Sequence, residues 1–300
     1  MIETVPNVSE GRRPDVIGEL VDAVNHEPGV WLLDQSADPS HNRSVFTIAG
    51  DADSLEAALL RLVAVAVARI DLRAHVGAHP RLGAVDVIPF VPLGTTTMAE
   101  CVALSRRVGR AIGERFQLPV FLYEESAINS KRRRLEHVRH GQFEGLAEKL
   151  REPGWRPDFG PSAPHPTAGA TVVGARRQLI AYNVHLDSND VTIARQIAAA
   201  VRESGGGLPG VKALGLALAH RRVAQVSMNL TDFGRTPVQT VFDAVQREAN
   251  ARGVLVLDSE LVGLIPEAAL AGTTPERLKL TGFTRSRILE VRIAERVARR

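Results

Sequence analysis

The amino-acid sequence predicts an α/β (α+β) protein of two subdomains, each with the strand–helix–strand–strand–helix–strand order (βαββαβ) called ferredoxin-like. Three observations predict it. The chain has 300 residues, enough for about two domains of roughly 150 residues each. Apolar residues recur with strand and helix periodicity in this order twice. A segment rich in proline and glycine, residues 152–174, separates the two series, so we expect subdomains 1–177 and 178–300.

In the first half, short apolar runs predict strands, and runs with a 3.6-residue period predict helices. Pro14 suits the first position of a helix, and Asp53 or Ser54 can cap the next one. A polar loop is expected over residues 34–42. The expected strands are 3–5, 30–33, 43–49, 84–90 and 119–123, and the expected helices are 14–25, 53–72 and 98–116.

The second half repeats this order. Arg221 and Arg222 connect two strand-like runs that we expect to pair, and Thr236 is the expected cap of the second helix. A basic amphipathic helix is expected over residues 285–300. The expected strands are 178–186, 211–219, 223–230 and 254–257, and the expected helices are 191–203 and 237–251.

Composition excludes several classes of protein. The single cysteine, Cys101, excludes an intrachain disulfide and a zinc site built from cysteines. The longest apolar stretch, residues 57–68, contains Arg61 and is too short to span a bilayer. The N-terminus carries no secretory signal, so we expect a cytoplasmic protein. Residues 1–100 are acidic and the rest is basic, which permits an anionic ligand, whereas 4% aromatic residues offer few stacking platforms for nucleic acid.

The densest polar segment runs from Arg73 to Asp86 and contains His75, His79 and Arg81. Two histidines four residues apart could bind a metal on one helix face, but the glycine and proline among them make a regular helix a poor expectation. A second interpretation is that His75 and His79 are surface histidines without a function. The third interpretation is acid–base chemistry, since histidine titrates near neutrality and Arg81 offers a fork for a carboxylate.

Two further loops have a structural and a functional interpretation each. Residues 34–44, with Asp38, Asn42 and Arg43, form either a hairpin loop of turn-forming residues or a polar rim for a substrate carboxylate. Residues 205–210 form either a plain helix-to-strand loop or a set of backbone amides that holds a flat heterocycle or an anion.

Several short segments of the chain form a familiar set. They are 5–12 (VPNVSEGR), 42–45 (NRSV), 79–87 (HPRLGAVDV), 119–124 (PVFLYE), 158–161 (DFGP), 174–176 (GAR) and 225–230 (QVSMNL). Together they span nearly the whole chain in one order, which is far more specific than any one motif. With these segments the chain resembles the glutamate formimidoyltransferase (formiminotransferase) family.

This resemblance implies a homodimer whose subdomains hold folate between them. It implies transfer of the formimidoyl group of N-formimidoyl-L-glutamate to N5 of tetrahydrofolate, including polyglutamylated forms, within histidine degradation and one-carbon metabolism. No metal, nucleic acid or membrane is implied. His79 takes the position of the family's catalytic histidine. The expected substrate-binding residues are Asp38, Asn42, Arg43, Arg81 and Arg176, and the expected folate-binding residues are Gly160, Pro161, Ser162, Thr167, Gly169, Gly205, Gly206, Gly207 and Gly210.

The sequence departs from the family in two ways. The family commonly has glutamate before the catalytic histidine, where this chain has Ala78, so we expect Asp34, Asp38 or Asp86 to hold His79 instead. Some members continue into a cyclodeaminase domain, so we expect a separate protein to process the product. The alternatives are formyl transfer from N-formylglutamate to tetrahydrofolate, a non-catalytic folate-binding protein and, more distantly, a polyanion-binding protein.

Overall fold

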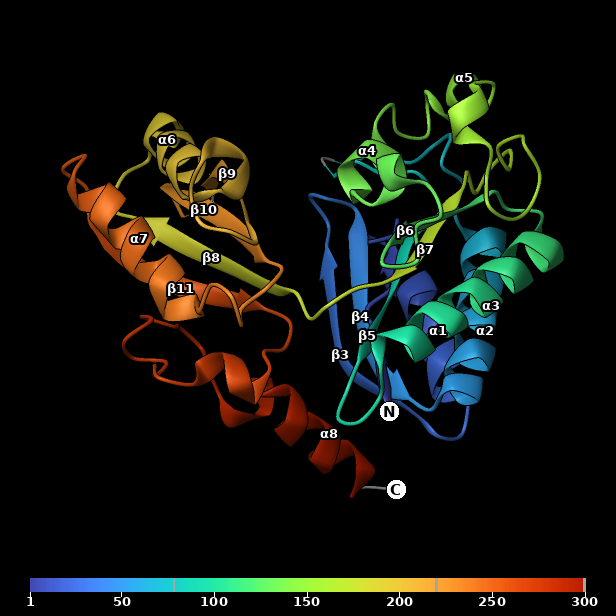
Figure 1. Ribbon diagram of the computed structural model, residues 1–300, viewed down its shortest axis with the longest axis horizontal. Coiled ribbons are helices and arrows are strands. Elements are labelled where there is room, and N and C mark those ends of the chain that lie inside the picture. The colour runs from blue at the N-terminus through green and yellow to red at the C-terminus, as the bar shows by residue number, and fades with distance from the viewer. Residues whose placement is uncertain (78, 219–220, 299–300) are drawn as a thin grey trace. The chain divides into compact units, whose positions relative to one another are not determined.

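A computed structural model describes residues 1–77, 79–218 and 221–298. The chain forms two compact units, Met1–Arg176 (unit 1) and Arg177–Arg300 (unit 2), which divide one residue before the expected boundary. Figure 1 shows a sheet with helices packed on it in each unit, so the predicted α/β class is confirmed.

Unit 1 is built on a seven-stranded sheet. Its first strand is interrupted at Pro6 into β1 (Ile2–Thr4) and β2 (Asn7–Val8), and both parts lie between β4 (Arg43–Gly50) and β5 (Val85–Pro92). On the other side of β4 lies β3 (Val30–Asp38), so the order β3-β4-β1/β2-β5 is that of a βαββαβ unit. The parallel strands β7 (Thr171–Ala175) and β6 (Val120–Glu124) extend the sheet beyond β5.

Three helices cover one face of this sheet: α1 (Pro14–Asn25), α2 (Ala52–Arg69) and α3 (Met98–Phe116) (Figure 1). Thr97 and Glu100 form a capping box at the start of α3. Asp51 caps α2, so the expected cap at Asp53 or Ser54 was wrong; the amides of both residues instead donate to the Asp51 carboxylate.

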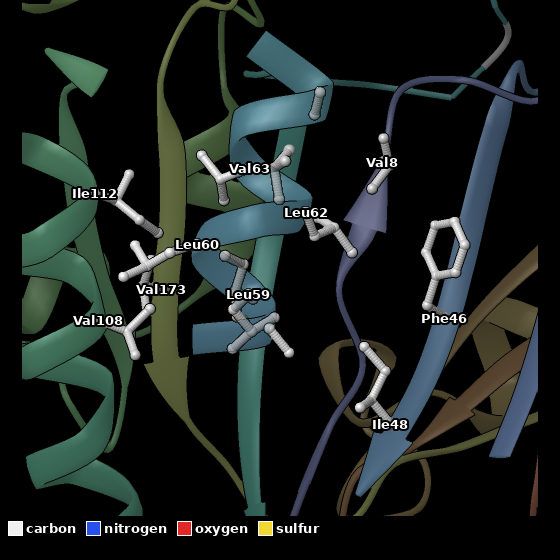
Figure 2. Close-up of a cluster of buried hydrophobic side chains, with 14 of the residues drawn as sticks. Val8, Phe46, Ile48, Leu59, Leu60, Leu62, Val63, Val108, Ile112 and Val173 are labelled. Carbon is white, nitrogen blue, oxygen red and sulfur yellow. The ribbon is translucent and has the colours of Figure 1, made fainter. Parts of the chain in front are cut away.

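The main core of unit 1 lies between these helices and the sheet. Figure 2 shows it as aliphatic side chains of α2 and α3 that point toward the strands. Leu59 and Leu62 of α2, Phe46 of β4 and Val173 of β7 are all fully buried. Burying a side chain of this size is worth roughly 1.5–3 kcal/mol, so this core anchors the scaffold that carries the site.

A second, smaller layer covers the other face of β6 and β7. It contains α4 (Leu135–Arg139) and α5 (Leu146–Lys149). Lys149 holds the end of α4, because its Nζ donates to the carbonyl oxygens of His137, Val138 and His140 at 2.7–3.0 Å. Arg132 forms a buried ion pair with Asp158 at 2.8 Å.

Unit 2 has the predicted βαββαβ order. Its antiparallel sheet has the order β11-β8-β10-β9, with α6 (Val191–Val201) and α7 (Val238–Asn250) packed on one face. The strands are β8 (Ile180–Leu186), β9 (Val211–Leu218), β10 (Val223–Leu230) and β11 (Val256–Val262). The expected pairing of β9 with β10 is confirmed, and α8 (Leu289–Val297) lies within the expected C-terminal helix.

Some expected elements were wrong. Residues 34–38 continue strand β3 rather than start a loop, because they pair with β4 as far as Asp38. The connector 152–174 was expected to be irregular throughout, but β7 begins at Thr171. Thr236 does not cap α7, since its hydroxyl donates to the carbonyl of Pro209. None of the described helices is long and apolar enough to cross a membrane.

Candidate active site

The histidine loop, residues 70–84 between α2 and β5, is tied to the β3–β4 turn by Asn42. This residue is buried and has a positive φ of 50°. Its Oδ1 accepts from the Gly11 amide at 2.9 Å, and its Nδ2 donates to the Val76 carbonyl at 3.1 Å. Its own carbonyl accepts from Nε2 of His75 at 2.9 Å. Asn42 therefore joins three segments, and the expectation that it binds substrate stays a prediction.

Two glycines permit this close packing. A Cβ atom on Gly77 would lie 2.2 Å from the carbonyl oxygen of His41. A Cβ atom on Gly11 would lie 2.4 Å from the carbonyl oxygen of Asp38 and 2.5 Å from the amide nitrogen of Arg43. Real Cβ atoms do not approach backbone this closely, so any larger residue would push the loop away from the turn.

His79 lies against Arg43, the first residue of β4. A guanidinium can only donate hydrogen bonds, so Nη1 of Arg43 donates to Nε2 of His79, which must carry a lone pair. Burial, followed by the charges of Arg43 and Arg139, lowers the pKa of His79 to about 3, and Asp86 opposes this shift. The imidazole is therefore neutral at physiological pH in the free protein.

Arg139 brings a second cation to His79 from α4. It pairs with Asp86 of β5, whose other oxygen accepts the amide of Leu82 at 2.7 Å. Asp86 is only 1% exposed, and its pairing with Arg139 meets the requirement of a buried carboxylate for a cation. This pair fixes the start of β5 beside the histidine loop.

The expectation that Asp34, Asp38 or Asp86 holds His79 stays a prediction: Asp86 acts on His79 through its charge, and no hydrogen bond from His79 to a carboxylate is seen among the described residues. Asp86 is committed to Arg139, and Asp38 pairs with His41 and accepts its amide at 3.0 Å. Ala78, on which the expectation rested, lies outside the described residues.

The fork of Arg81 is already occupied. Its two terminal nitrogens donate to the carboxylate of Glu144 at 2.7 and 2.9 Å, and its side chain is 11% exposed. A substrate carboxylate would have to compete with this bidentate pair. The assignment of Arg81 to substrate therefore stays a prediction that the free protein does not favour.

The expected folate-binding stretch, Gly160–Gly169, pairs at its end with the beginning and the end of the histidine loop. The amide of Leu72 donates to the carbonyl of Thr167 at 2.8 Å, and the amide of Ala84 donates to that of Ala168 at 2.9 Å. Gly83 and Gly169 are bridged as in a β-ladder. Two segments that are about 85 residues apart in the chain are thus brought together, each of them singled out by the sequence.

Within this stretch, Gly160 has a positive φ of 79° and packs where a Cβ atom would lie 2.1 Å from the carbonyl oxygen of Leu118. Packing alone thus requires glycine at this position. Ser162 is exposed, whereas Pro161 and Thr167 are half-buried. Their contact with folate stays a prediction.

The second expected folate segment lies in unit 2, where it ends α6. The amides of Gly205, Gly206 and Gly207 donate to carbonyls of Arg202 and Glu203 at 3.0 Å. The amide of Gly210 donates to the Glu203 carboxylate at 3.2 Å. All four amides are thus engaged within the protein, which weakens the interpretation that they hold an anion.

Arg176 follows β7, and its amide donates to the carbonyl of Phe90 at 2.9 Å. Its charge and a side-chain hydrogen bond act on Tyr123, which Arg139 also influences. The expectation that Arg176 binds substrate stays a prediction.

Sequence analysis missed Arg139 and His41 as members of this cluster. The ring of His41 meets that of His79 edge to face, with centroids 6.2 Å apart. Arg139 is 60 residues from His79 in the chain and carries no local signal. His41 was visible within the polar loop, and its position next to Asn42 was the signal available.

Unit 2 holds a different buried histidine on the sheet face away from its helices. His185 of β8 is 1% exposed, and its Nδ1 lies 2.5 Å from the carboxylate of Asp258. Its Nε2 lies 3.0 Å from Oε1 of Gln225, and Arg221 pairs with Asp258 at 2.7 Å.

The described residues contain no group of three or more His, Cys, Asp or Glu side chains that could hold a metal ion.

Comparison with known proteins identifies the family. Residues 1–176 match the family described as "Formiminotransferase domain, N-terminal subdomain", and residues 181–275 match "Formiminotransferase domain". Glutamate formimidoyltransferase of Streptococcus pyogenes serotype M1 is 46% identical over 283 residues, which cover 94% of this chain and 95% of that protein.

Two further relatives agree. Glutamate formimidoyltransferase of Thermoplasma acidophilum is 44% identical over 292 residues, covering 97% of this chain and 96% of that protein. Formimidoyltransferase-cyclodeaminase of Rattus norvegicus is 42% identical over 276 residues, covering 90% of this chain and 51% of that protein. The resemblance expected from the motifs is confirmed: the chain belongs to the formiminotransferase family.

Proposed function

We propose that the protein transfers the formimidoyl group of N-formimidoyl-L-glutamate to N5 of tetrahydrofolate, with His79 as the general acid–base. The observation that carries this proposal is a neutral histidine beside a mostly buried arginine, on a loop paired with the expected folate stretch. The full-length relatives named glutamate formimidoyltransferase support the choice of reaction.

The reaction exchanges one C–N bond for another. N5 of the folate attacks the formimidoyl carbon and loses a proton, and the bond from that carbon to the glutamate nitrogen breaks as this nitrogen gains a proton. A neutral imidazole can take the first proton and deliver it for the second step. Such acid–base help supplies about 10²–10⁴-fold, and holding the two substrates together can supply roughly 7–11 kcal/mol more.

The remaining residues would bind and position the substrates. Arg43 is the best-placed group for a carboxylate of the donor, because among the described residues its guanidinium has no carboxylate partner. Asn42 and His75 would hold the loop, and residues 165–170 would place the folate stretch next to it. The place of this reaction in histidine degradation and one-carbon metabolism, the homodimer, the use of polyglutamylated folate and the cytoplasmic location stay predictions drawn from the resemblance.

The test is a direct assay of transfer. The purified protein is incubated with tetrahydrofolate and N-formimidoyl-L-glutamate, and released L-glutamate and formimidoyl-tetrahydrofolate are quantified by mass spectrometry. N-formyl-L-glutamate is assayed in parallel. Faster turnover with the formimidoyl donor than with the formyl donor supports the proposal. Turnover with only the formyl donor would replace it with formyl transfer, and binding of tetrahydrofolate without turnover would indicate a non-catalytic folate-binding protein.

A further inference from the structure

The charges around His79 do not balance. Arg43 reaches it from β4 and Arg139 from α4, while Asp86 faces it from β5. Asp86 pairs with Arg139, which leaves the Arg43 guanidinium without a carboxylate among the described residues. Burial, followed by the charge of Arg139, lowers the pKa of Arg43 to about 10, and the charges of Asp86 and Asp38 oppose this shift.

The other ionisable groups near the site are paired among themselves. Asp38 at the end of β3 pairs with His41, and Glu144 pairs with Arg81 of the histidine loop. His75 uses Nε2 to hold the turn. None of these carboxylates forms an ion pair with Arg43 among the described residues.

Several polar atoms of this cluster are buried without a hydrogen-bond partner among the described residues. They are Nδ1 of His75, Nε of Arg81 and Nε of Arg139. Buried polar atoms are normally satisfied, and the exceptions need an explanation. Arg81 and Arg139 already pair with Glu144 and Asp86, so Arg43 is the cation of this cluster that has no ion pair among the described residues, and an anion would supply one.

We infer that Arg43 forms a carboxylate subsite beside His79 and that filling this subsite withdraws Arg43 from Nε2 of the histidine. This inference rests on the proposed function in taking the carboxylate from the glutamate part of the donor. A carboxylate is a stronger acceptor for a guanidinium than a neutral imidazole, since its hydrogen bonds are charge-assisted and can be bidentate. Donor binding then frees the lone pair that must accept the proton from N5.

The consequence is an acid–base group that the donor itself activates. In the free protein the lone pair of His79 is engaged and a cation lies against the ring. With the subsite filled, the negative charge of the carboxylate offsets Arg43, so protonation of His79 becomes easier. The direction is fixed: donor binding raises the pKa of His79.

The experiment is an NMR titration of the His79 ring, with the resonance assigned by its loss in His79→Asn. The probes are glutarate, a dicarboxylate, and glutaramide, its neutral counterpart. Saturating glutarate should raise the pKa of His79 by at least roughly one pH unit, whereas glutaramide should leave it unchanged. In Arg43→Gln the pKa should already be raised without a probe and should not respond to glutarate.

Arg73→Gln is the matched control, because Arg73 is an exposed arginine on the same loop that pairs with Asp71. It should respond as the parent protein does. An unchanged His79 pKa at saturating glutarate, a full response in Arg43→Gln, or no binding of glutarate would each overturn the inference. If the pKa of His79 responds to glutarate but no formimidoyl transfer is detected, the carboxylate subsite is supported and only the proposed function is refuted.

Discussion

The two units share one strand order but differ in what connects their elements. In unit 1 the connection from helix α2 to strand β5 spans residues 70–84, whereas the matching connection from α7 to β11 in unit 2 spans residues 251–255. The longer connection is the histidine loop. The chemistry proposed for unit 1 would therefore lie in a segment added to the scaffold, in agreement with the general concentration of function in loops.

One histidine in each unit sharpens this contrast. His79 is half-buried on a loop, where Arg43 contacts its ring and Arg139 lies near it. His185 is fully buried on a strand, where Asp258, Gln225 and Arg221 occupy both of its ring nitrogens. Among the described residues, the ring of His185 is thus enclosed by protein partners, whereas His79 contacts a guanidinium that has no ion pair.

Removing the ring of His79 should have the largest effect on activity. We expect His79→Asn to lower kcat by about 10²–10⁴-fold, because general acid–base catalysis is lost, with the Kd of tetrahydrofolate changed little. His26→Asn, an exposed histidine at the end of α1, should leave kcat unchanged. Steady-state kinetics and calorimetry measure the two quantities separately, and near-normal kcat in His79→Asn would exclude the assignment.

The part of unit 1 formed by β6, β7 and α4 should depend on the buried ion pair between Arg132 and Asp158 for its stability. The side chains of Arg132 and Asp158 are 6% and 7% exposed, so Asp158→Ala leaves a buried cation and should cost about 3–5 kcal/mol of unfolding free energy. Asp53→Ala, at an exposed pair with Arg107, should cost about 1 kcal/mol or less.

Denaturant unfolding with hydrogen-exchange mass spectrometry locates this loss. Protection should fall in β6, β7 and α4 and stay unchanged in unit 2. Equal losses of protection in both units would show that the ion pair does not stabilise β6, β7 and α4 specifically.

Moving the histidine loop should have a smaller effect than removing His79. Gly77→Ala places a Cβ atom against the carbonyl of His41, so the loop must shift away from Arg43. We expect kcat to fall by roughly tenfold to a hundredfold, since small misplacements of catalytic groups carry penalties of this size. Gly154→Ala, which meets nothing within 4 Å, is the control. Parent-like kcat in Gly77→Ala would show that the packing of the loop on the turn is not required.

Local signals predicted much of the scaffold. Helices 14–25 and 98–116 were predicted with the bounds that the structure has, because proline at the first turn and regular apolar spacing mark them. Strand β7 and helices α4 and α5 were not predicted. Helices α4 and α5 have only five and four residues, too few to show a helical period, and β7 lies in the segment that was expected to be an irregular connector.

The site was predictable only in part. His79 and Arg43 were each singled out within a local cluster, but the pairing of Arg139 with Asp86 joins residues 53 positions apart. In the basic run 131–134, three side chains are exposed, yet Arg132 is buried against Asp158 and the rings of Phe121 and Trp155. Which charged residues become buried depends on long-range pairing, which a single sequence does not display.

The pH dependence of kcat/KM in the parent protein and in Arg43→Gln tests most directly the claim that His79 is a base held neutral by burial and by its cationic neighbours, Arg43 first among them. Because kcat/KM reports the free enzyme, and the pKa of His79 there is about 3, the parent should show no acid limb from this group near neutral pH. Removing the cation should raise the pKa toward the ordinary value of about 6.5, so the acid limb of Arg43→Gln should move to higher pH while that of Arg73→Gln should not. An acid limb that stays in place, or moves to lower pH, in Arg43→Gln would contradict the account.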